Sequence, residues 1–230
     1  MTKDTGVAIH SDALLGKRVL LAIAGGIAAV ESVRLARELR RHQADLTVIM
    51  SEEATKIITP LAVSWGSDTI VHQGWSSEMS QLEGFDLILI APATRNTISK
   101  HLHGIMDSPL LMALSASRGR KSKLCFVPSM HTDLFDDPVT SELLDALRDE
   151  GSHVIINEVD EGKLKQPDPI SIVAEVCQIA NRSQSSKSIA ITMGANRAPI
   201  DAVRAIQNAS SGRTGWIIAE YLYRLGHNVI

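Results

Sequence analysis

The sequence has few cysteines, little net charge and no long apolar run, and each shortage excludes a class of protein. Cys125 and Cys177 are the two cysteines among 230 residues, and neither has a partner at disulfide or metal-ligand spacing. We therefore predict two buried thiols in a reducing compartment, and no metal site.

The formal net charge is −3, with acidic and basic residues interspersed, which argues against a nucleic-acid or membrane-surface partner. The first apolar run, Val19 to Ala24, is too short for a signal peptide or a membrane span. A hydrophobic content of 44% is enough for a buried core. These features predict a cytoplasmic protein that acts on a small molecule.

Short apolar runs separated by helical patterns predict the fold class. The runs are typical of strands covered on both faces. They cover 19–23, 46–50, 87–90, 124–127 and 154–156. Between most of them the apolar residues recur at helical spacing, and Asp137 followed by Pro138 is a typical helix start. We predict an α/β, doubly wound parallel sheet flanked by helices, Rossmann-like or flavodoxin-like.

The chain divides, on its pattern, into an N-terminal arm (1–16), a main domain (17–181), a polar serine-rich linker (182–187) and a C-terminal segment (188–230). The segment predicts a strand at 189–192, a helix at about 214–225 and a new strand from Asn228. One helix between two strands cannot bury its own apolar faces. We expect a short, incomplete second α/β unit that needs a partner surface or belongs to a longer chain.

Small, hydroxyl and amide side chains follow the apolar strand at 87–90, in the run Ala-Pro-Ala-Thr-Arg-Asn-Thr that covers 91–97. In open α/β sheets, ligands bind at the carboxyl ends of strands, where free N–H groups and short polar side chains reach a phosphate. This pattern predicts a bound anionic cofactor.

The same segment resembles the Pro-Ala-Thr/Ser-Ala-Asn-Thr motif of the flavin-dependent cysteine decarboxylases, a homo-oligomeric family that binds FMN. The resemblance implies FMN contacts at Pro92, Ala93, Thr94, Asn96 and Thr97. It also implies an assembly of the chain with itself, as a trimer or a dodecamer.

Two other turns resemble the phosphate-binding turns of that family. Gly25, Gly26 and Ile27 follow the first strand, while Ser51 and Thr55 follow the second. Taken alone, a glycine pair serves any tight turn, and Ser51 is equally typical of a helix cap.

The stretch 127–135 resembles the family's Pro-Ala-Met-Asn-x-x-Met-Trp segment, with His131 where asparagine is usual, as in archaeal-type members. The resemblance implies that Met130 contacts FMN and that His131 binds the substrate carboxylate. Without this resemblance, His131 would be interpreted as an ordinary loop histidine.

The stretch 158–165 resembles the Glu-Glu-Gly-Lys-Ala-Lys run of archaeal members, so Lys163 and Lys165 become candidates for binding a substrate phosphate. The alternative is that both lysines belong to a solvated charged loop.

The family's catalytic histidine is missing from its expected place. Counting back eight residues from Asp86 gives Glu78, which could act as the general acid or base. His72, six residues earlier, is the other candidate. Either this chain decarboxylates by an altered mechanism, or it keeps the flavin-binding fold without the decarboxylase activity.

The C-terminal segment resembles the beginning of phosphopantothenate–cysteine ligase in two long motifs, at 192–201 and 206–215, the second containing Asn208. Only about the first forty residues of that ligase are represented, so we expect no ligase activity from this chain alone.

Together these resemblances imply FMN-dependent decarboxylation of 4'-phosphopantothenoylcysteine, a phosphorylated cysteine amide, in coenzyme A biosynthesis. One alternative is a non-catalytic FMN-binding subunit that scaffolds or regulates a separate ligase chain. A second is a decarboxylase of peptide C-terminal cysteine, which the ligase-like tail disfavours. A nicotinamide dehydrogenase is disfavoured because Ala-Gly-Gly-Ile-Ala-Ala at 24–29 is not Gly-x-Gly-x-x-Gly.

Overall fold

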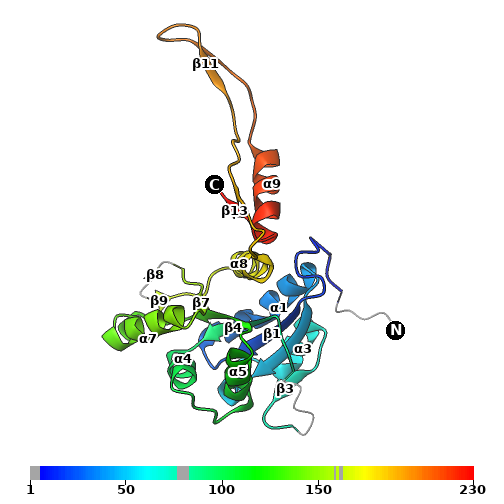
Figure 1. Ribbon diagram of the computed structural model, residues 1–230, viewed down its shortest axis with the longest axis vertical. Helices are drawn as coiled ribbons and strands as arrows, with labels where there is room; N and C mark the ends of the chain where they lie inside the picture. The colour runs from blue at the N-terminus through cyan, green and yellow to red at the C-terminus, as the bar shows by residue number, and fades with distance from the viewer. Residues whose placement is uncertain (1–5, 77–82, 158, 161–162) are drawn as a thin grey trace. The chain divides into compact units, whose positions relative to one another are not determined.

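The computed structural model of the chain describes residues 6–76, 83–157, 159–160 and 163–230, with the backbone alone at 159, 160 and 163 (Figure 1). It forms two compact units, one ending at Val176 and one from Cys177 to Ile230. Up to the end of the first unit the elements are β1 (Arg18–Ile23), η1 (Ile27–Glu31), α1 (Ser32–Arg41), β2 (Asp45–Met50), α2 (Glu52–Thr55), α3 (Pro60–Ser67), β3 (Val71–Gln73), β4 (Leu87–Ala93), α4 (Arg95–Leu102), α5 (Pro109–Gly119), β5 (Lys123–Pro128), β6 (Met130–His131), α6 (Thr132–Phe135), α7 (Pro138–Asp149), β7 (His153–Val154), β8 (Val159–Asp160), β9 (Lys163–Leu164) and α8 (Pro169–Asn181), which continues into the second unit.

A six-stranded sheet in the order β3-β2-β1-β4-β5-β7 forms the centre of the first unit, and all of its pairs are parallel. The predicted doubly wound fold is therefore confirmed. The strand order reverses between β1 and β4, which is the point where open α/β sheets bind ligands beyond the carboxyl ends of the strands.

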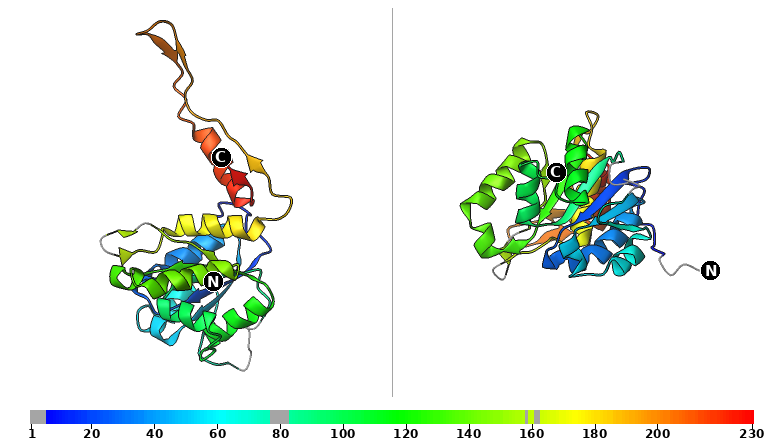
Figure 2. Two further views of the ribbon diagram at one scale, coloured as in Figure 1. Left: turned by 60° about the vertical axis from the view of Figure 1, so that its left-hand side comes forward. Right: turned by 90° about the horizontal axis from the view of Figure 1, so that it is seen from below.

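Helices cover both faces of this sheet (Figure 2). On one face, strand residues such as Leu20, Ile88 and Phe126 form one apolar cluster with side chains of α4, α5 and α7. Helices α1 and α3 pack against each other, with Leu35 and Val63 fully buried. Because successive strand residues point to opposite faces, a sheet covered on both sides requires unbroken apolar strands, as the sequence has.

Within the part of the chain that the structure describes, neither cysteine forms a disulfide, and both are buried, as the composition predicted. Burial raises the pKa of the Cys125 thiol far above its ordinary value, so this thiol remains protonated at neutral pH.

A buried polar network ties α4 to α5 and to the end of α7. His101 on α4 is 2% exposed and packs against Phe126, and its Nε2 lies 2.9 Å from Oε1 of Glu150. Arg118 and Ser152 donate further hydrogen bonds to Glu150. Burial lowers the pKa of His101, against the opposing effect of Glu150. Burial by itself would raise the pKa of Glu150, but the hydrogen bonds from Ser152, His101 and Arg118 lower it. Neutral His101 thus donates from Nε2 to an ionised carboxylate.

The lowered pKa of His101 makes stability depend on pH. Below the ordinary histidine value of 6.5 the unfolded chain takes up a proton that the folded chain resists, so the free energy of unfolding falls as pH drops, by at most about 1.4 kcal/mol per pH unit. The variant His101→Gln keeps an N–H donor for Glu150 and does not titrate. Urea unfolding at pH 7.5 and 5.5 should show a smaller loss of unfolding free energy for this variant than for the parent chain. His103→Gln, at an exposed histidine just beyond α4, is the matched control; equal losses in the parent and His101→Gln would contradict the assignment.

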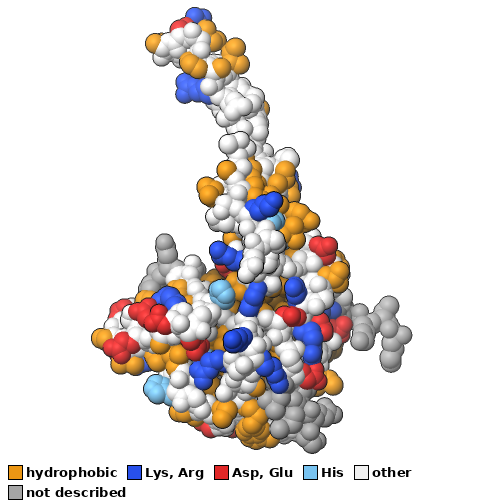
Figure 3. Space-filling model, viewed as in Figure 1, with side chains coloured by type: hydrophobic (Ala, Val, Ile, Leu, Met, Phe, Trp, Pro, Cys, Tyr) orange, Lys and Arg blue, Asp and Glu red, His pale blue; other side chains and the backbone are white. Residues whose placement is uncertain are grey.

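The second unit contains β10 (Ser188–Ile189), β11 (Arg197–Pro199), β12 (Ala205–Gln207), α9 (Arg213–Arg224) and β13 (Asn228–Val229). β10 pairs with β13 in parallel, and β11 with β12 in an antiparallel hairpin. Trp216, Ile217 and Tyr221 on α9 are each more than half exposed, and apolar side chains are prominent on the face of this unit seen in Figure 3. The unit therefore leaves apolar surface uncovered, as expected for one helix between two short strands. Among the described residues, no helix has both the length and the apolar composition that crossing a lipid bilayer requires.

Candidate functional site

The turns that follow β1, β2 and β4 meet at the carboxyl edge of the sheet. The Ala24 N–H donates to the Pro92 carbonyl at 3.2 Å, and the Ser51 N–H donates to the Ile23 carbonyl at 3.0 Å. These bonds continue the ladder beyond the strands and fix the three turns next to one another. Three segments that resemble the FMN-binding turns of one family are thereby assembled into one site.

The turn after β1 approaches α2 so closely that only glycine fits at position 25. A Cβ atom added there would lie 2.2 Å from Cβ of Glu53 and 3.0 Å from its backbone carbonyl carbon. At Gly26 an added Cβ would meet Thr94 and Pro92 at ordinary contact distances, 3.5 Å and more. Of the predicted glycine pair, Gly25 is therefore the residue that the backbone requires.

A smaller cavity of about 380 Å³ lies beside these turns. Its walls include the predicted cofactor residues Gly25, Ser51, Thr94, Asn96 and Thr97. The Ser51 hydroxyl accepts from the Ala54 N–H and caps α2, so both interpretations of Ser51, as cap and as wall of the site, agree with the structure. Thr94 caps α4 in the same way, accepting from the Thr97 N–H at 3.2 Å. The Thr94 hydroxyl at the start of α4 and the ammonium group of Lys100 make one side of this cavity suited to an anionic group, while the carboxylates of Glu52, Glu53 and Asp107 line the rest.

A larger cavity of about 870 Å³ shares Thr94 and Asn96 with the smaller one. Its walls also include predicted residues from three other segments: Gly26, Ile27, Met130, His131 and Lys165. The wall is mostly apolar with a few polar groups, which is typical of a site for a cofactor or small substrate.

His131 begins α6 at the wall of the larger cavity, and its side chain is 57% exposed. The Asp133 N–H donates to its Nδ1 at 3.4 Å, and a carboxylate oxygen of Asp133 lies 3.2 Å from the same atom. When Nδ1 accepts from the Asp133 N–H, the ring proton lies on Nε2, which is the ring atom that can donate to a ligand. An N–H donor at Nε2 is suited to a carboxylate.

The two segments predicted to bind substrate are neighbours in the fold. β6 pairs with β9 in an antiparallel ladder that aligns His131 with Lys163 and Met130 with Leu164. The structure describes only the backbone of Lys163, while Lys165 reaches the wall of the larger cavity.

Gln166 also lines the larger cavity, and it was absent from the sequence prediction. Both polar atoms of its amide are buried and have no hydrogen-bond partner among the described residues. A buried amide without partners costs free energy, so this side chain is expected to bind a ligand that enters the cavity.

Ion pairs frame the larger cavity, and the sequence pattern assigned none of their members to the site. Guanidinium nitrogens of Arg34 lie 2.9 Å from a carboxylate oxygen of Glu31 and 3.4 Å from one of Asp168. A guanidinium nitrogen of Arg95 lies 2.7 Å from a carboxylate oxygen of Asp137. The Val139 N–H, and then the Arg95 guanidinium, lower the pKa of Asp137. Arg34 has the spacing of a solvated helix face, and only the folded chain shows that this face borders a cavity.

Several predicted residues lie outside both cavity walls. Pro92 and Ala93 are buried in β4 behind the turn, and the Thr55 hydroxyl donates to the Glu52 carbonyl at 2.7 Å. His72 lies on the edge strand β3 and lines neither cavity. Glu78 falls outside the described residues, so its role stays a prediction.

Asn208 belongs to the second unit, where its side-chain oxygen accepts from the Ser210 N–H at 3.2 Å. It is exposed, and its backbone N–H donates to the Asn196 carbonyl, which joins the two ligase-like motifs. A ligase role for Asn208 stays a prediction.

The fold defines an α/β protein with two adjoining cavities at the switch point of its sheet. Residues 7–181 match the family described as Flavoprotein, and residues 184–230 match the DNA/pantothenate metabolism flavoprotein C-terminal domain. The chain belongs to the flavoprotein family, as the resemblance predicted.

Similar proteins include those described as coenzyme A biosynthesis bifunctional protein CoaBC. That of Thermococcus kodakarensis is 39% identical over 221 residues, which are 93% of this chain and 55% of the relative. That of Bacillus subtilis is 31% identical over 235 residues, which are 94% of this chain and 57% of the relative. The chain thus spans little more than half the length of these relatives.

Solved structures of similar fold include a mutant of PPC decarboxylase complexed with pantothenoylaminoethenethiol and the FMN binding protein AtHal3, each with a TM-score of 0.60. They are 21% and 22% identical to this chain, cover 70% of it, and are themselves covered to 96% and 94%. At this level of identity they support the fold alone.

Proposed function

We propose that this chain binds FMN and decarboxylates 4'-phosphopantothenoylcysteine to 4'-phosphopantetheine in coenzyme A biosynthesis. The observation that carries the proposal is the meeting of the three family-like turns around two adjoining cavities that share Thr94 and Asn96. Membership of the flavoprotein family and the relatives named for coenzyme A biosynthesis support it.

The residues present fit FMN. The smaller cavity offers a phosphate the hydroxyls of Ser51, Thr94 and Thr97 and the ammonium group of Lys100. The carboxylates of Glu52, Glu53 and Asp107 line its other walls, so the phosphate would bind on the side of the hydroxyls. The larger cavity, mostly apolar, has room for a flat ring system, and the unpartnered amide of Gln166 in its wall calls for a ligand. Thr94 and Asn96 would hold the part of the cofactor that joins the two.

FMN, when bound, supplies the two-electron oxidation and reduction on which the reaction depends. The chain binds and orients the substrate: Nε2 of His131 donates to the carboxylate that leaves as carbon dioxide, and Lys165 attracts the distal phosphate. In the net reaction the bond to the carboxylate carbon breaks and a C–H bond replaces it, with uptake of one proton. Glu78 is our candidate for the group that transfers protons, because His72 lines neither cavity.

A turnover assay tests this proposal. Incubation of the FMN-loaded chain with 4'-phosphopantothenoylcysteine should release carbon dioxide and form 4'-phosphopantetheine in equal amounts, and Glu78→Gln should lower the rate if Glu78 transfers protons. A chain that binds FMN but gives no product would overturn the enzymatic part. It would favour the second candidate, a non-catalytic FMN subunit for a separate ligase chain, which the replacement of the family's histidine by Glu78 supports.

We propose further that the chain assembles with itself, as a trimer or a dodecamer, and that residues 188–230 form the start of a ligase-like domain after the linker at 182–187. Both parts rest on the family resemblance. Sedimentation of the FMN-loaded chain should give a mass of at least three chains, and a monomer at micromolar concentration would contradict the assembly.

A further inference from the structure

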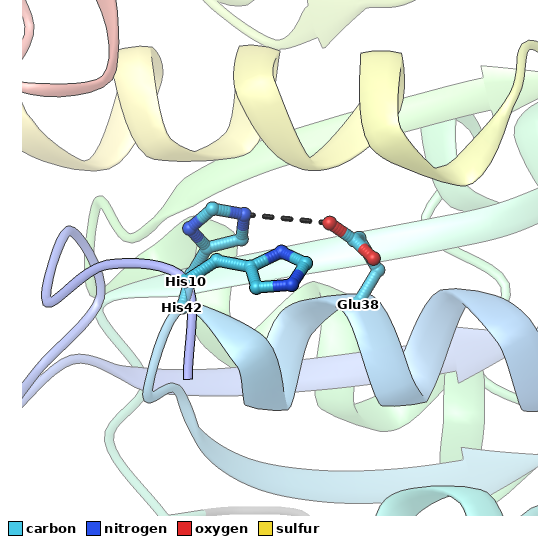
Figure 4. Close-up of side chains that lie close together, drawn as sticks. All are labelled: His10, Glu38 and His42. Carbon is cyan, nitrogen blue, oxygen red and sulfur yellow. Dashed lines mark ion pairs between the residues drawn. The ribbon is translucent and has the colours of Figure 1, made fainter. Parts of the chain in front are cut away.

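Three metal-ligand side chains gather at the C-terminal end of α1, away from both cavity walls (Figure 4). Glu38 lies on the last turns of α1, His42 directly follows the helix, and His10 comes from the N-terminal arm. One ligand atom from each of the three lies within 4.8 Å of the others. Glu38 and His42 are 3% and 4% exposed, whereas His10 is exposed. Two of the three potential ligands are therefore shielded from solvent.

Backbone hydrogen bonds hold the arm against the end of α1, so the position of His10 does not depend on its ring. The His10 N–H donates to the Arg41 carbonyl at 2.8 Å, and the Leu14 N–H donates to the His42 carbonyl at 2.9 Å. The Gln43 side chain donates to the Ser11 carbonyl. The arm thus delivers an imidazole to a fixed place beside the two buried ligands.

The side chains of Glu38 and His42 each make a hydrogen bond to a neighbouring group through one of their polar atoms. The Ser11 hydroxyl lies 2.7 Å from Nδ1 of His42, and Arg41 donates to Oε2 of Glu38 at 2.6 Å. Nε2 of His42 and Oε1 of Glu38 lie 3.4 Å apart. Metal-ligating histidines are typically oriented by a hydrogen bond at their other ring nitrogen, as Ser11 provides here.

We propose that His10, Glu38 and His42 form a site for a divalent transition metal of the zinc class, which cross-links the N-terminal arm to α1. Two imidazoles and one carboxylate are a common zinc ligand set that leaves the fourth position to water. With metal–ligand distances of about 2.0–2.1 Å, neighbouring ligand atoms of a tetrahedron lie about 3.4 Å apart, which is the separation already present between His42 and Glu38. The ligand atom of His10 lies within 4.8 Å of the other two, and its exposed imidazole has to move closer to them to complete the set.

Titration of the untagged, metal-free chain with zinc chloride in a calorimeter tests the site. We expect one Zn²⁺ per chain, and Co²⁺ in its place should give the visible absorption bands of a four-coordinate ion with nitrogen and oxygen ligands. His10→Ala should weaken zinc binding at least about tenfold, because it removes one of three protein ligands. Since His10 is exposed, this variant is expected to fold normally.

His103→Ala, which also removes an exposed histidine from the chain, is the matched control and should bind zinc as the parent does. Glu38→Gln should weaken binding as well, because it removes the anionic ligand. Absence of stoichiometric zinc binding by the parent chain would overturn the proposal. So would equal affinity in the parent and His10→Ala, since zinc would then be bound by other groups.

Discussion

Gly25→Ala should lose most of its bound flavin. An added Cβ at this position would lie 2.2 Å from Cβ of Glu53, so the turn after β1 and the start of α2 have to move apart. Both residues line the smaller cavity, where we place the FMN phosphate. Overpacking that displaces backbone costs about 1–3 kcal/mol, which corresponds to FMN binding weaker by about 10–100-fold. Fluorescence titration of the apo chain with FMN measures the change.

Gly119→Ala is the control for this substitution. Gly119 ends α5, and an added Cβ there meets nothing within 4 Å, so its affinity for FMN should equal that of the parent. Circular dichroism establishes whether Gly25→Ala retains the fold. A folded Gly25→Ala chain with unchanged FMN affinity would remove the turn after β1 from the cofactor site.

His131→Ala should lower kcat/KM for 4'-phosphopantothenoylcysteine by about 10–100-fold while the FMN content stays unchanged. A hydrogen bond to a charged group contributes about 1.5–3 kcal/mol, and the variant loses the Nε2 donor to the substrate carboxylate. The Asp133 contacts to Nδ1 are local to the loop, so the loss of the ring should leave the sheet intact.

His131→Asn tests this role more closely than alanine does. Asparagine is the residue that the resembling family usually has here, and its side-chain amide supplies a neutral N–H donor. We expect His131→Asn to recover much of the rate that alanine loses. If both variants match the parent in kcat/KM, His131 does not bind the substrate; if both lose FMN, its role is in holding the cofactor or the loop.

Short, unbroken apolar runs made the sheet predictable from the sequence. The runs expected at 19–23, 46–50, 87–90 and 124–127 lie within β1, β2, β4 and β5, because a strand buried on both faces needs continuous apolar residues. Asp137 caps α7 as predicted, because an acidic side chain directly before a proline is a typical helix start. The edge strand β3 escaped notice, because a three-residue strand at a polar edge leaves no pattern.

The residues expected to contact the cofactor could be predicted from the sequence, whereas the other polar residues of the larger cavity could not. Thr94, Asn96 and their neighbours are adjacent along the chain and carry a recognisable motif. Gln166 and Arg34 reach the same cavity from distant segments, and neither stands in a pattern that separates it from solvated surface. The pairing of β6 with β9 also depends on contacts between distant segments, which is why His131 and Lys163 were predicted separately.

The flavin content of the purified chain decides whether the two cavities at the sheet edge hold FMN. After reconstitution with FMN and removal of the excess, we expect a yellow protein with a flavin absorption spectrum and about one FMN released per chain on denaturation. A folded but colourless chain that does not bind added FMN would contradict the assignment of this site.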